Sequence, residues 1–496
     1  MTSLEIREYL EKLELCSICI LRYQNESIEN IIILYTAQNN KNETMDTSVG
    51  TDTIAIKRSK KSICIACLGI FQSMETVSKN VIEDSNLRNY ECNSLYTSVQ
   101  IPIELLVREL SIWIALIQTF PGKVNEDTHP GIPIKDVFKT LFNRKLCLAT
   151  NRQMEYNQNG IMINLFYEFM DCDNIDNLLA VKPLSFGNEN HKKSKNVSVI
   201  TRNLFEKHFY PKNLKIDEYK KHLAVPPKLP SNGPIKLTRY LISGPTIFIA
   251  GRYRKLSRDL SQTPWIIAGK RMKEKSIQEL ISCEICPYFG IDDKEISFIS
   301  SGREDTDVRM LGKGRPFVLQ IPDAKKSSLP KNIAAEMQSR IDSTKLVSVQ
   351  HLQLIKREEL IHIKLGEENK KKSYRALCIL KTNVNAEIMQ LLLNKSDGFL
   401  VQQKTPLRVL HRRPLLNRPR QIFSLKGYIV KDQPKAIVLD VLTQAGAYIK
   451  ELIHGDFGRT KPSISSIIGH DIDIITLDVN AIDLEWPPEV SNQLDL

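Results

Sequence analysis

Apolar residues recur at two spacings along the chain, and the spacing separates expected helices from expected strands. A helical period runs through "IPIELLVRELSIWIALIQTF" and "IKDVFKTLFNRKL", and again through residues 275–285 and 385–395. Short β-rich runs occupy residues 160–171, 195–203, 246–253, 296–300, 375–380 and 421–430. Helices interleaved with short strands predict the α+β class, with a mixed or antiparallel sheet.

Breaks in this pattern divide the chain. The segment "AVPPKLPSNGP" holds four prolines and a glycine with little to bury, which indicates a linker. We therefore expect one domain over residues 1–224, a linker at 225–234 and a second domain over 235–496, in keeping with a chain of 496 residues. Residues 39–62 are polar and lack periodicity, so they predict a surface loop.

The most apolar segment, residues 101–120, is interrupted by Glu104, Arg108 and Glu109. It predicts a helix packed in a core and not a membrane span. The amino-terminal residues alternate in charge and lack the apolar stretch of a signal peptide. These patterns predict an intracellular protein, in the nucleus, the cytoplasm or both, with no membrane partner.

The net charge of the chain indicates which class of partner it binds. The chain carries a net charge of +12, which favours polyanions. The segment "QKTPLRVLHRRPLLNRPRQ" concentrates that charge without one acidic residue, as expected of a phosphate-binding surface. Its cations are Lys404, Arg408, Arg412, Arg413, Arg418 and Arg420.

Cysteines form two C-x-x-C pairs near the amino terminus, Cys16 with Cys19 and Cys64 with Cys67. Each pair can offer two thiolates to one ion, and four thiolates complete a closed tetrahedral zinc site without catalytic capacity. The alternative is two unrelated pairs of buried cysteines. A third pair, Cys283 and Cys286, has no second pair nearby and is expected to be structural.

A carboxylate-rich turn follows the strand-like run in "FISSGREDTDVRML". Asp305 lies there between Arg303 and Arg309. If both guanidinium groups lie close, they lower the pKa of the carboxyl group and favour a nucleophile over a proton donor. The alternative is a surface turn with solvated ion pairs.

Four segments together carry a resemblance: "AGRYRKLSRDLSQTPW", "SSGREDTDVRMLGKGRPF", "KTPLRVLHRRP" and "GAYIKELIHGDFGRTKP". In order and spacing the chain resembles the archaeal and eukaryotic tRNA pseudouridine synthase family acting on uridines 54 and 55 of the TΨC arm. The resemblance is dense over residues 245–487 and looser before them. It implies a carboxy-terminal pseudouridine synthase fold, a mixed sheet flanked by helices with an RNA-binding cleft. It also implies an amino-terminal accessory domain with the zinc site and a THUMP-type part at about 130–224.

The resemblance assigns roles to individual residues. Asp305 matches the nucleophile of the superfamily's Gly-Arg-x-Asp turn, with Asp307 as the rival. Lys450 matches the basic partner of that aspartate, and Ala447 departs from the threonine usual in the family. The expected substrate-binding residues are Tyr374, Tyr448, Ile449 and Arg303, and the expected phosphate-binding residues are Lys404, Arg412 and Arg413.

The implied reaction breaks the bond between N1 of uracil and the ribose and rejoins the base through C5. It needs a nucleophile and a closed pocket but no catalytic cofactor, so a structural zinc is the one group expected. We expect a monomer that binds tRNA, with other structured RNA as a further partner. Two alternatives stay open: a catalytically inactive RNA-binding or scaffold protein with the same fold, and a structural zinc protein whose basic face meets protein or DNA.

Overall fold

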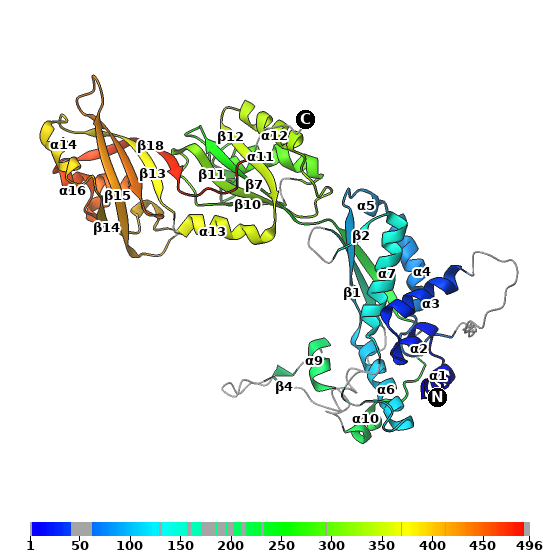
Figure 1. The fold of residues 1–496 in the computed structure, drawn as a ribbon. Coiled ribbons are helices and arrows are strands. Elements are labelled where there is room, and N and C mark those ends of the chain that lie inside the picture. Colours follow the sequence, from blue (N-terminus) through cyan, green and yellow to red (C-terminus); the bar gives the residue numbers. More distant parts are fainter. Residues whose placement is uncertain are drawn as a thin grey trace. The chain divides into compact units, whose positions relative to one another are not determined.

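The computed structural model describes residues 2–40, 62–125, 127, 131–155, 160–169, 185–186, 195–196, 202–209, 215–229, 233–292, 295–368, 370–411 and 413–490. The chain divides into two compact units, Met1–Ser243 and Gly244–Leu496 (Figure 1). Most of the loop expected at 39–62 lies outside the described residues. Within the described ranges, no helix combines the length and the apolar character that crossing a bilayer requires.

A four-stranded sheet forms the centre of the first unit, in the order β2-β1-β3-β6. β1 pairs in parallel with β2 and β3, and β3 pairs antiparallel with β6. Side chains of β3 alternate between buried and half-buried positions, as the period of two in its sequence predicts. The strands are β1 (Ser94–Gln100), β2 (Gln153–Met154), β3 (Ile161–Glu168) and β6 (Lys236–Ser243).

Helices cover this sheet, and the predicted apolar helix is the most buried of them. α6 (Ile103–Thr119) is buried along most of its length, with Glu104, Arg108 and Glu109 inside the fold. α7 (Ile134–Thr150) packs on β1 and α4. The other helices of the unit are α1 (Thr2–Lys12), α2 (Ser17–Tyr23), α3 (Ile28–Asn40), α4 (Ile70–Glu83), α5 (Ser85–Arg88), α9 (Arg202–His208) and α10 (Ile216–His222).

Two expectations for this unit differ from the structure. Of the strand expected over 195–203, residues 197–201 lie outside the described ranges; β5 (Lys195–Asn196) pairs with β4 (Ser185–Phe186), and α9 begins at Arg202, inside the expected strand. The second unit, expected to begin at residue 235, begins at Gly244, because β6 returns to pair with β3. The proline-rich segment is thus a connection inside the first unit.

A ten-stranded mixed sheet forms the second unit, in the order β12-β7-β11-β18-β13-β16-β15-β14-β17, with β10 paired to β11. β11 and β18 are parallel, and the other pairs are antiparallel. The α+β class with a mixed sheet is therefore confirmed. The strands are β7 (Ile247–Lys255), β10 (Ser297–Ser300), β11 (Arg309–Ile321), β12 (Val347–Ile355), β13 (Lys372–Leu380), β14 (Phe399–Lys404), β15 (Asn417–Ile429), β16 (Ala436–Thr443), β17 (Thr460–Lys461) and β18 (Ile472–Ile482).

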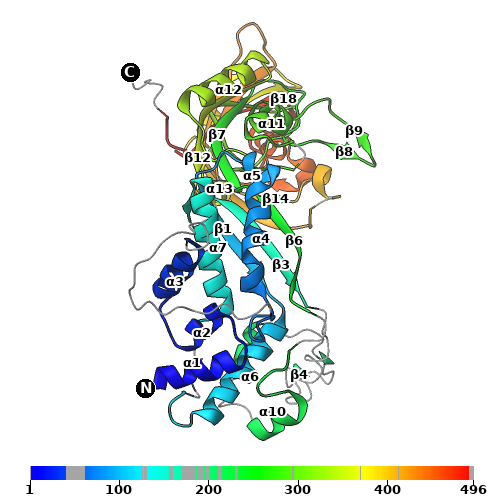
Figure 2. The ribbon, with the colours of Figure 1, turned by 90° about the vertical axis from the view of Figure 1, so that its right-hand side faces the viewer.

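Helices pack on this sheet, both at its β12 end and on the central strand β18. α12 packs against β12, beside α11 (Figure 2). A short hairpin of β8 and β9 precedes α11. The remaining elements are β8 (Ile266–Ile267), β9 (Lys270–Arg271), α11 (Ile277–Ile285), η2 (Cys286–Phe289), α12 (Lys331–Ser343), η3 (Arg357–Leu360), α13 (Ile361–Glu368), α14 (Ala386–Leu393), η4 (Leu407–Val409), α15 (Ile449–His454), η5 (Asp456–Gly458) and α16 (Ile464–Ile468).

Candidate active site

The turn between β10 and β11 sends two neighbouring acidic side chains to different places. Gly302 begins it with a φ of +87°, a conformation that glycine adopts without strain. Glu304 points inward, where it accepts hydrogen bonds from Nε of Arg315 at 2.8 Å and from the hydroxyl group of Tyr253 at 2.9 Å. Asp305 keeps 35% of its side chain exposed and lines a pocket. The buried pair beneath the turn thus fixes the direction of Asp305.

A buried lysine holds the main chain of the same turn. Nζ of Lys255, at the end of β7, donates to the carbonyl oxygen atoms of Asp305 at 2.9 Å and Thr306 at 2.6 Å. The side chain is fully buried, and burial lowers the pKa of Lys255 to about 8. The ammonium group of Lys255 is removed from water, and it donates to two main-chain carbonyl groups of the turn. This arrangement indicates that Lys255 positions the turn.

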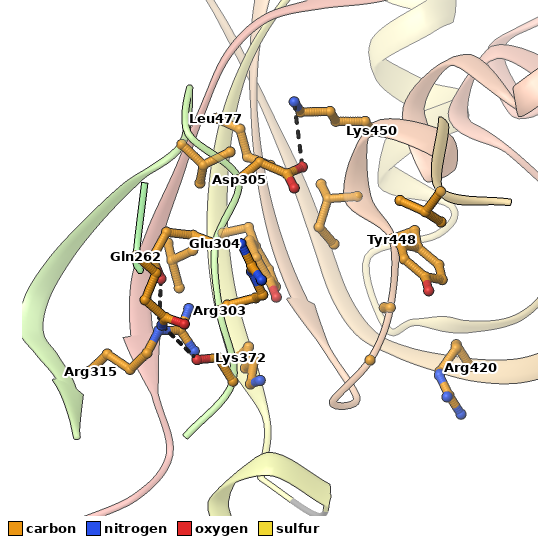
Figure 3. A pocket seen from close by; sticks show the side chains of 18 of the residues that line it. Gln262, Arg303, Glu304, Asp305, Arg315, Lys372, Arg420, Tyr448, Lys450 and Leu477 are labelled. Carbon is orange, nitrogen blue, oxygen red and sulfur yellow. Dashed lines mark hydrogen bonds and ion pairs between the residues drawn. The ribbon is translucent and has the colours of Figure 1, made fainter. Parts of the chain in front are cut away.

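Two cations approach the carboxylate of Asp305 from the facing wall. Oδ2 of Asp305 lies 3.0 Å from Nη1 of Arg408 and 3.7 Å from Nζ of Lys450. Figure 3 shows the side chains of Asp305 and Lys450 pointing toward each other across the pocket. The predicted pair of Asp305 and Lys450 is therefore present, but Arg408 is the nearer cation.

The rival carboxylate, Asp307, holds Lys450 more closely. Nζ of Lys450 lies 2.7 and 2.9 Å from the two carboxylate oxygen atoms of Asp307. Partial burial alone would raise the pKa of Asp307, but the hydrogen bond and charge of Lys450 outweigh it and lower that pKa. Asp307 is more exposed than Asp305 and is not among the residues that line the pocket. It is therefore a partner for Lys450 and not a second group in the cavity.

Arg408 bridges two carboxylates. Its Nε donates to Oε1 of Glu451 at 2.8 Å, and Glu451 lies buried on α15. Burial alone would lower the pKa of Arg408, but the hydrogen bond and charge of Glu451, followed by those of Asp305, raise it. The sequence grouped Arg408 with the phosphate-binding cations. The structure corrects that grouping, because η4 aims this side chain at Asp305 and Glu451.

The arginines nearest to Asp305 in sequence do not surround it as expected. Arg309 pairs with Asp478 on β18, through Nε at 2.9 Å and Nη2 at 2.7 Å. Arg258 reaches the same carboxylate at 2.6 Å. Arg303 does line the pocket. The condition that both guanidinium groups lie close to Asp305 is therefore not met by Arg309, because the strand β11 carries it toward β18.

The pocket has a volume of about 390 Å³ and is lined by side chains from β11, β13, β15, β18, η4 and the start of α15, together with the turn that carries Asp305. Burial raises the pKa of Tyr374 to about 12, so its phenol is neutral at physiological pH. Tyr448 is held through its main chain, where Gln403 makes two hydrogen bonds of 2.9 Å. The structure thus brings the predicted substrate-binding residues to one cavity: Arg303, Tyr374, Tyr448 and Ile449, with Ala447 beside them.

The predicted phosphate-binding residues fall in different places. Arg413 is exposed and lines the pocket. Lys404 is the last residue of β14 and is exposed, outside the pocket lining. Arg412 lies outside the described residues.

The four amino-terminal cysteines meet around one point. Their sulfur atoms all lie within 4.8 Å of one another, and those of Cys16 and Cys67 are 3.8 Å apart. Thiolates at the usual Zn–S distance of about 2.3 Å sit about 3.8 Å apart in a regular tetrahedron. Nη1 of Arg22 donates to the sulfur of Cys19 at 3.6 Å, which suits a charged thiolate. The donor set and spacing therefore fit a zinc ion.

The third cysteine pair takes no part in such a cluster within the described residues. Cys283 lies exposed on α11, and Cys286 is buried at the start of η2.

Sequence reasoning missed two residues that support the site without lining the pocket, Lys255 and Glu451. Lys255 carried only a weak signal, since it follows Arg252 and Arg254 on a strand whose first half is apolar. Glu451 carried no such signal, because an acidic residue in the first turn of a helix is common.

Comparison with known proteins places both units in one family. Residues 248–483 match the family described as "Pus10, C-terminal", and residues 64–237 match "Eukaryotic Pus10, N-terminal". The Pus10 protein of Drosophila melanogaster is 42% identical over 505 residues, covering 99% of each chain.

Two further relatives carry the same family name. The tRNA pseudouridine synthase Pus10 of Homo sapiens is 34% identical and covers 95% of this chain and 86% of its own. That of Methanocaldococcus jannaschii is 38% identical over 47% of this chain and 52% of its own. Since the similarity to the insect and human proteins extends over nearly the whole chain, this protein belongs to the Pus10 family.

Proposed function

We propose that this protein, an isomerase of the Pus10 family, converts uridine to pseudouridine in tRNA, at positions 54 and 55 of the TΨC arm, with Asp305 as the nucleophile. The observation that carries the proposal is the geometry of Asp305. Its carboxylate opens into a pocket with two tyrosines, and two cations lie within 4 Å of it. The names of the relatives support tRNA as the substrate class.

The proposed reaction balances without a redox partner or a second substrate. The C1′–N1 bond breaks, the uracil turns within the pocket, a C1′–C5 bond forms, and the proton on C5 is lost while N1 gains one. Substrate and product are isomers, so the chain supplies only groups that bind, orient and transiently bond. Asp305 attacks C1′ of the ribose, adds to C6 of the base or removes a ribose proton, and its position beside the cavity suits each of these roles.

The target uridine reaches Asp305 only after leaving its stack, which costs a few kcal/mol. Stacking on Tyr374 offsets part of that cost, at roughly 1–3 kcal/mol per base. Tyr448 and Ile449 form the facing wall, and Lys450 and Arg408 stabilise charge on Asp305. Lys404, Arg412 and Arg413 hold phosphates of the surrounding RNA, which positions the tRNA without reading its sequence.

The first unit acts, on this proposal, as an accessory RNA-binding domain of the THUMP type. Cys16, Cys19, Cys64 and Cys67 hold a structural zinc ion in a closed site that has no position for a reacting ligand. The protein works as a monomer, in the nucleus, the cytoplasm or both.

The test is incubation of the purified protein with an unmodified tRNA transcript, followed by mapping of pseudouridine at single-nucleotide resolution. Transcripts with cytidine at position 54, at position 55 or at both show which uridine is used. The proposal expects product at one or both positions and none in the doubly substituted transcript. Tight binding without any product would favour the inactive RNA-binding alternative.

A further inference from the structure

Two arginines on β15 stand apart from the charged groups around Asp305. Arg418 and Arg420 are two residues apart on a strand, so their side chains leave the same face of the sheet. Both line the pocket, and both also line a narrow annex of it beside Tyr448. Figure 3 shows Arg420 and Tyr448 together, on the side of the pocket away from Glu304 and Arg315.

Several other arginines of this unit have carboxylate partners, and these two lack them. Arg315 pairs with Glu304, Arg408 with Asp305, and Arg375 with Asp440. Among the residues that the structure describes, none offers a carboxylate within 4 Å of Arg418 or Arg420. Burial and then the charge of Arg418 lower the pKa of Arg420. The two cations therefore repel each other, with Arg418 exposed and Arg420 half-buried.

The packing around Arg420 leaves one of its donors without an acceptor. Nε of Arg420 is buried and has no hydrogen-bond partner among the described residues. Nη1 reaches only the carbonyl oxygen of Pro419, at 3.2 Å. Gly446 lies against the guanidinium group with a φ of +79°, and a Cβ atom there would stand 3.1 Å from Nη2. The glycine thus lets the loop before α15 lie against this group.

We infer that Arg418 and Arg420 form one anion site that takes a backbone phosphodiester of the RNA next to the target uridine. An anion between the two guanidinium groups removes their repulsion and accepts charge-assisted hydrogen bonds from their terminal nitrogen atoms. Such a contact fixes the register of the RNA strand on the protein and carries no sequence information. This inference rests on the proposed function for the identity of the RNA, but not for the chemistry of the site.

The variants to compare are Arg418→Gln, Arg420→Gln, the double variant, and the double variant with lysine at both positions. Arg375→Gln is the matched control. Arg375 follows the pocket residue Tyr374 on β13, so it leaves the opposite face of the sheet, and it is paired with Asp440. Thermal unfolding followed by circular dichroism shows whether each variant keeps the fold.

Binding of an unmodified tRNA transcript is measured against salt concentration for each protein. Loss of one phosphate contact lowers the slope of log K against log salt by about 0.7–0.9. We expect that decrease in the double glutamine variant, nearly the same decrease in each single variant, recovery with lysine, and no change in Arg375→Gln. A decrease twice as large in the double variant would mean two separate phosphates, and an unchanged slope in a folded double variant would mean no site; either result overturns the inference.

Two further readouts test the anion site and separate the two proposals. At equal ionic strength, inorganic phosphate should compete with the transcript more strongly than chloride in the wild type but not in the double glutamine variant; equal competition in both proteins would contradict the inference. In turnover, KM should rise in the double variant while kcat changes little. If the wild type makes no pseudouridine but the slope still falls as expected, the anion site stands and the proposed function fails.

Discussion

The guanidinium group of Arg408 lies 3.0 Å from the carboxylate of Asp305, closer than the ammonium group of Lys450. The same guanidinium group donates to the buried Glu451 at 2.8 Å. Because one cation serves both carboxylates, Glu451 sets the direction from which Arg408 meets Asp305. The nucleophile proposed here is therefore positioned by residues from two segments distant from it in the sequence, η4 and α15.

Replacing Arg408 should disturb stability and catalysis together. In Arg408→Gln, the buried Glu451 loses its cation, and an unpaired buried group costs about 1–3 kcal/mol of the free energy of unfolding. Adding Glu451→Gln removes the uncompensated charge, so the double variant should be more stable than Arg408→Gln alone. Urea unfolding of the four proteins in this cycle gives the coupling energy. Additive effects would show that the two side chains do not depend on each other.

Lys255 predicts a particular dependence of stability on pH. Its pKa falls from 10.5 to about 8 on folding, so between these values the unfolded chain binds more protons than the folded chain. Stability contributed by this residue therefore rises with pH across that window, by at most about 1.4 kcal/mol per pH unit. The difference in free energy of unfolding between wild type and Lys255→Met should increase from pH 8 to 10.5. A constant difference would contradict the lowered pKa.

Tyr374 should act through its ring. Because burial raises the pKa of its phenol to about 12, the group stays neutral at physiological pH. Tyr374→Phe keeps the stacking surface and should retain most of kcat/KM, whereas Tyr374→Ala should lose about 5- to 150-fold, the equivalent of 1–3 kcal/mol of stacking. Steady-state turnover on a tRNA transcript measures both. An inactive Tyr374→Phe variant would assign the chemistry to the hydroxyl group instead.

The cysteine cluster predicts one zinc ion per chain, measurable by mass spectrometry of the purified protein. Cys64→Ser should lose that zinc and destabilise the first unit, because the four sulfur atoms lie within 4.8 Å of one another. Cys283→Ser is the matched control, since Cys283 is exposed on α11 and outside the cluster. Equal zinc content in both variants would refute the assignment.

Local patterns in the sequence predicted elements well where one periodicity dominated. β3 and α6 were expected from spacings of two and of three to four residues, and both are present. The strand expected over 195–203 was wrong at its end, where α9 begins, because a short mixed segment supports either structure. The proline-rich segment led us to place the domain boundary too early in the chain, since proline and glycine mark a loop whether or not a domain ends there.

The pocket could be anticipated only through the resemblance, and its internal pairing could not. Asp305 and Lys450 were expected together, and the structure brings them within 4 Å. That Arg408 lies nearer depends on how η4 aims its side chain beside α15, which no local pattern records. Arg309, close in sequence, is carried to Asp478 by the pairing of β11 with β18.

A pair of amide variants shows which of the two neighbouring carboxylates, Asp305 or Asp307, reacts with the uridine. Asp305→Asn and Asp307→Asn each remove one charge beside Lys450. The measurement is single-turnover release of tritium from C5-labelled uridine in a tRNA transcript, with binding checked for both variants. We expect that Asp305→Asn binds the transcript and releases no tritium, while Asp307→Asn keeps release within about tenfold of wild type, since it loses a partner of Lys450 worth about 1 kcal/mol. Release by Asp305→Asn at the wild-type rate would show that Asp305 is not the nucleophile.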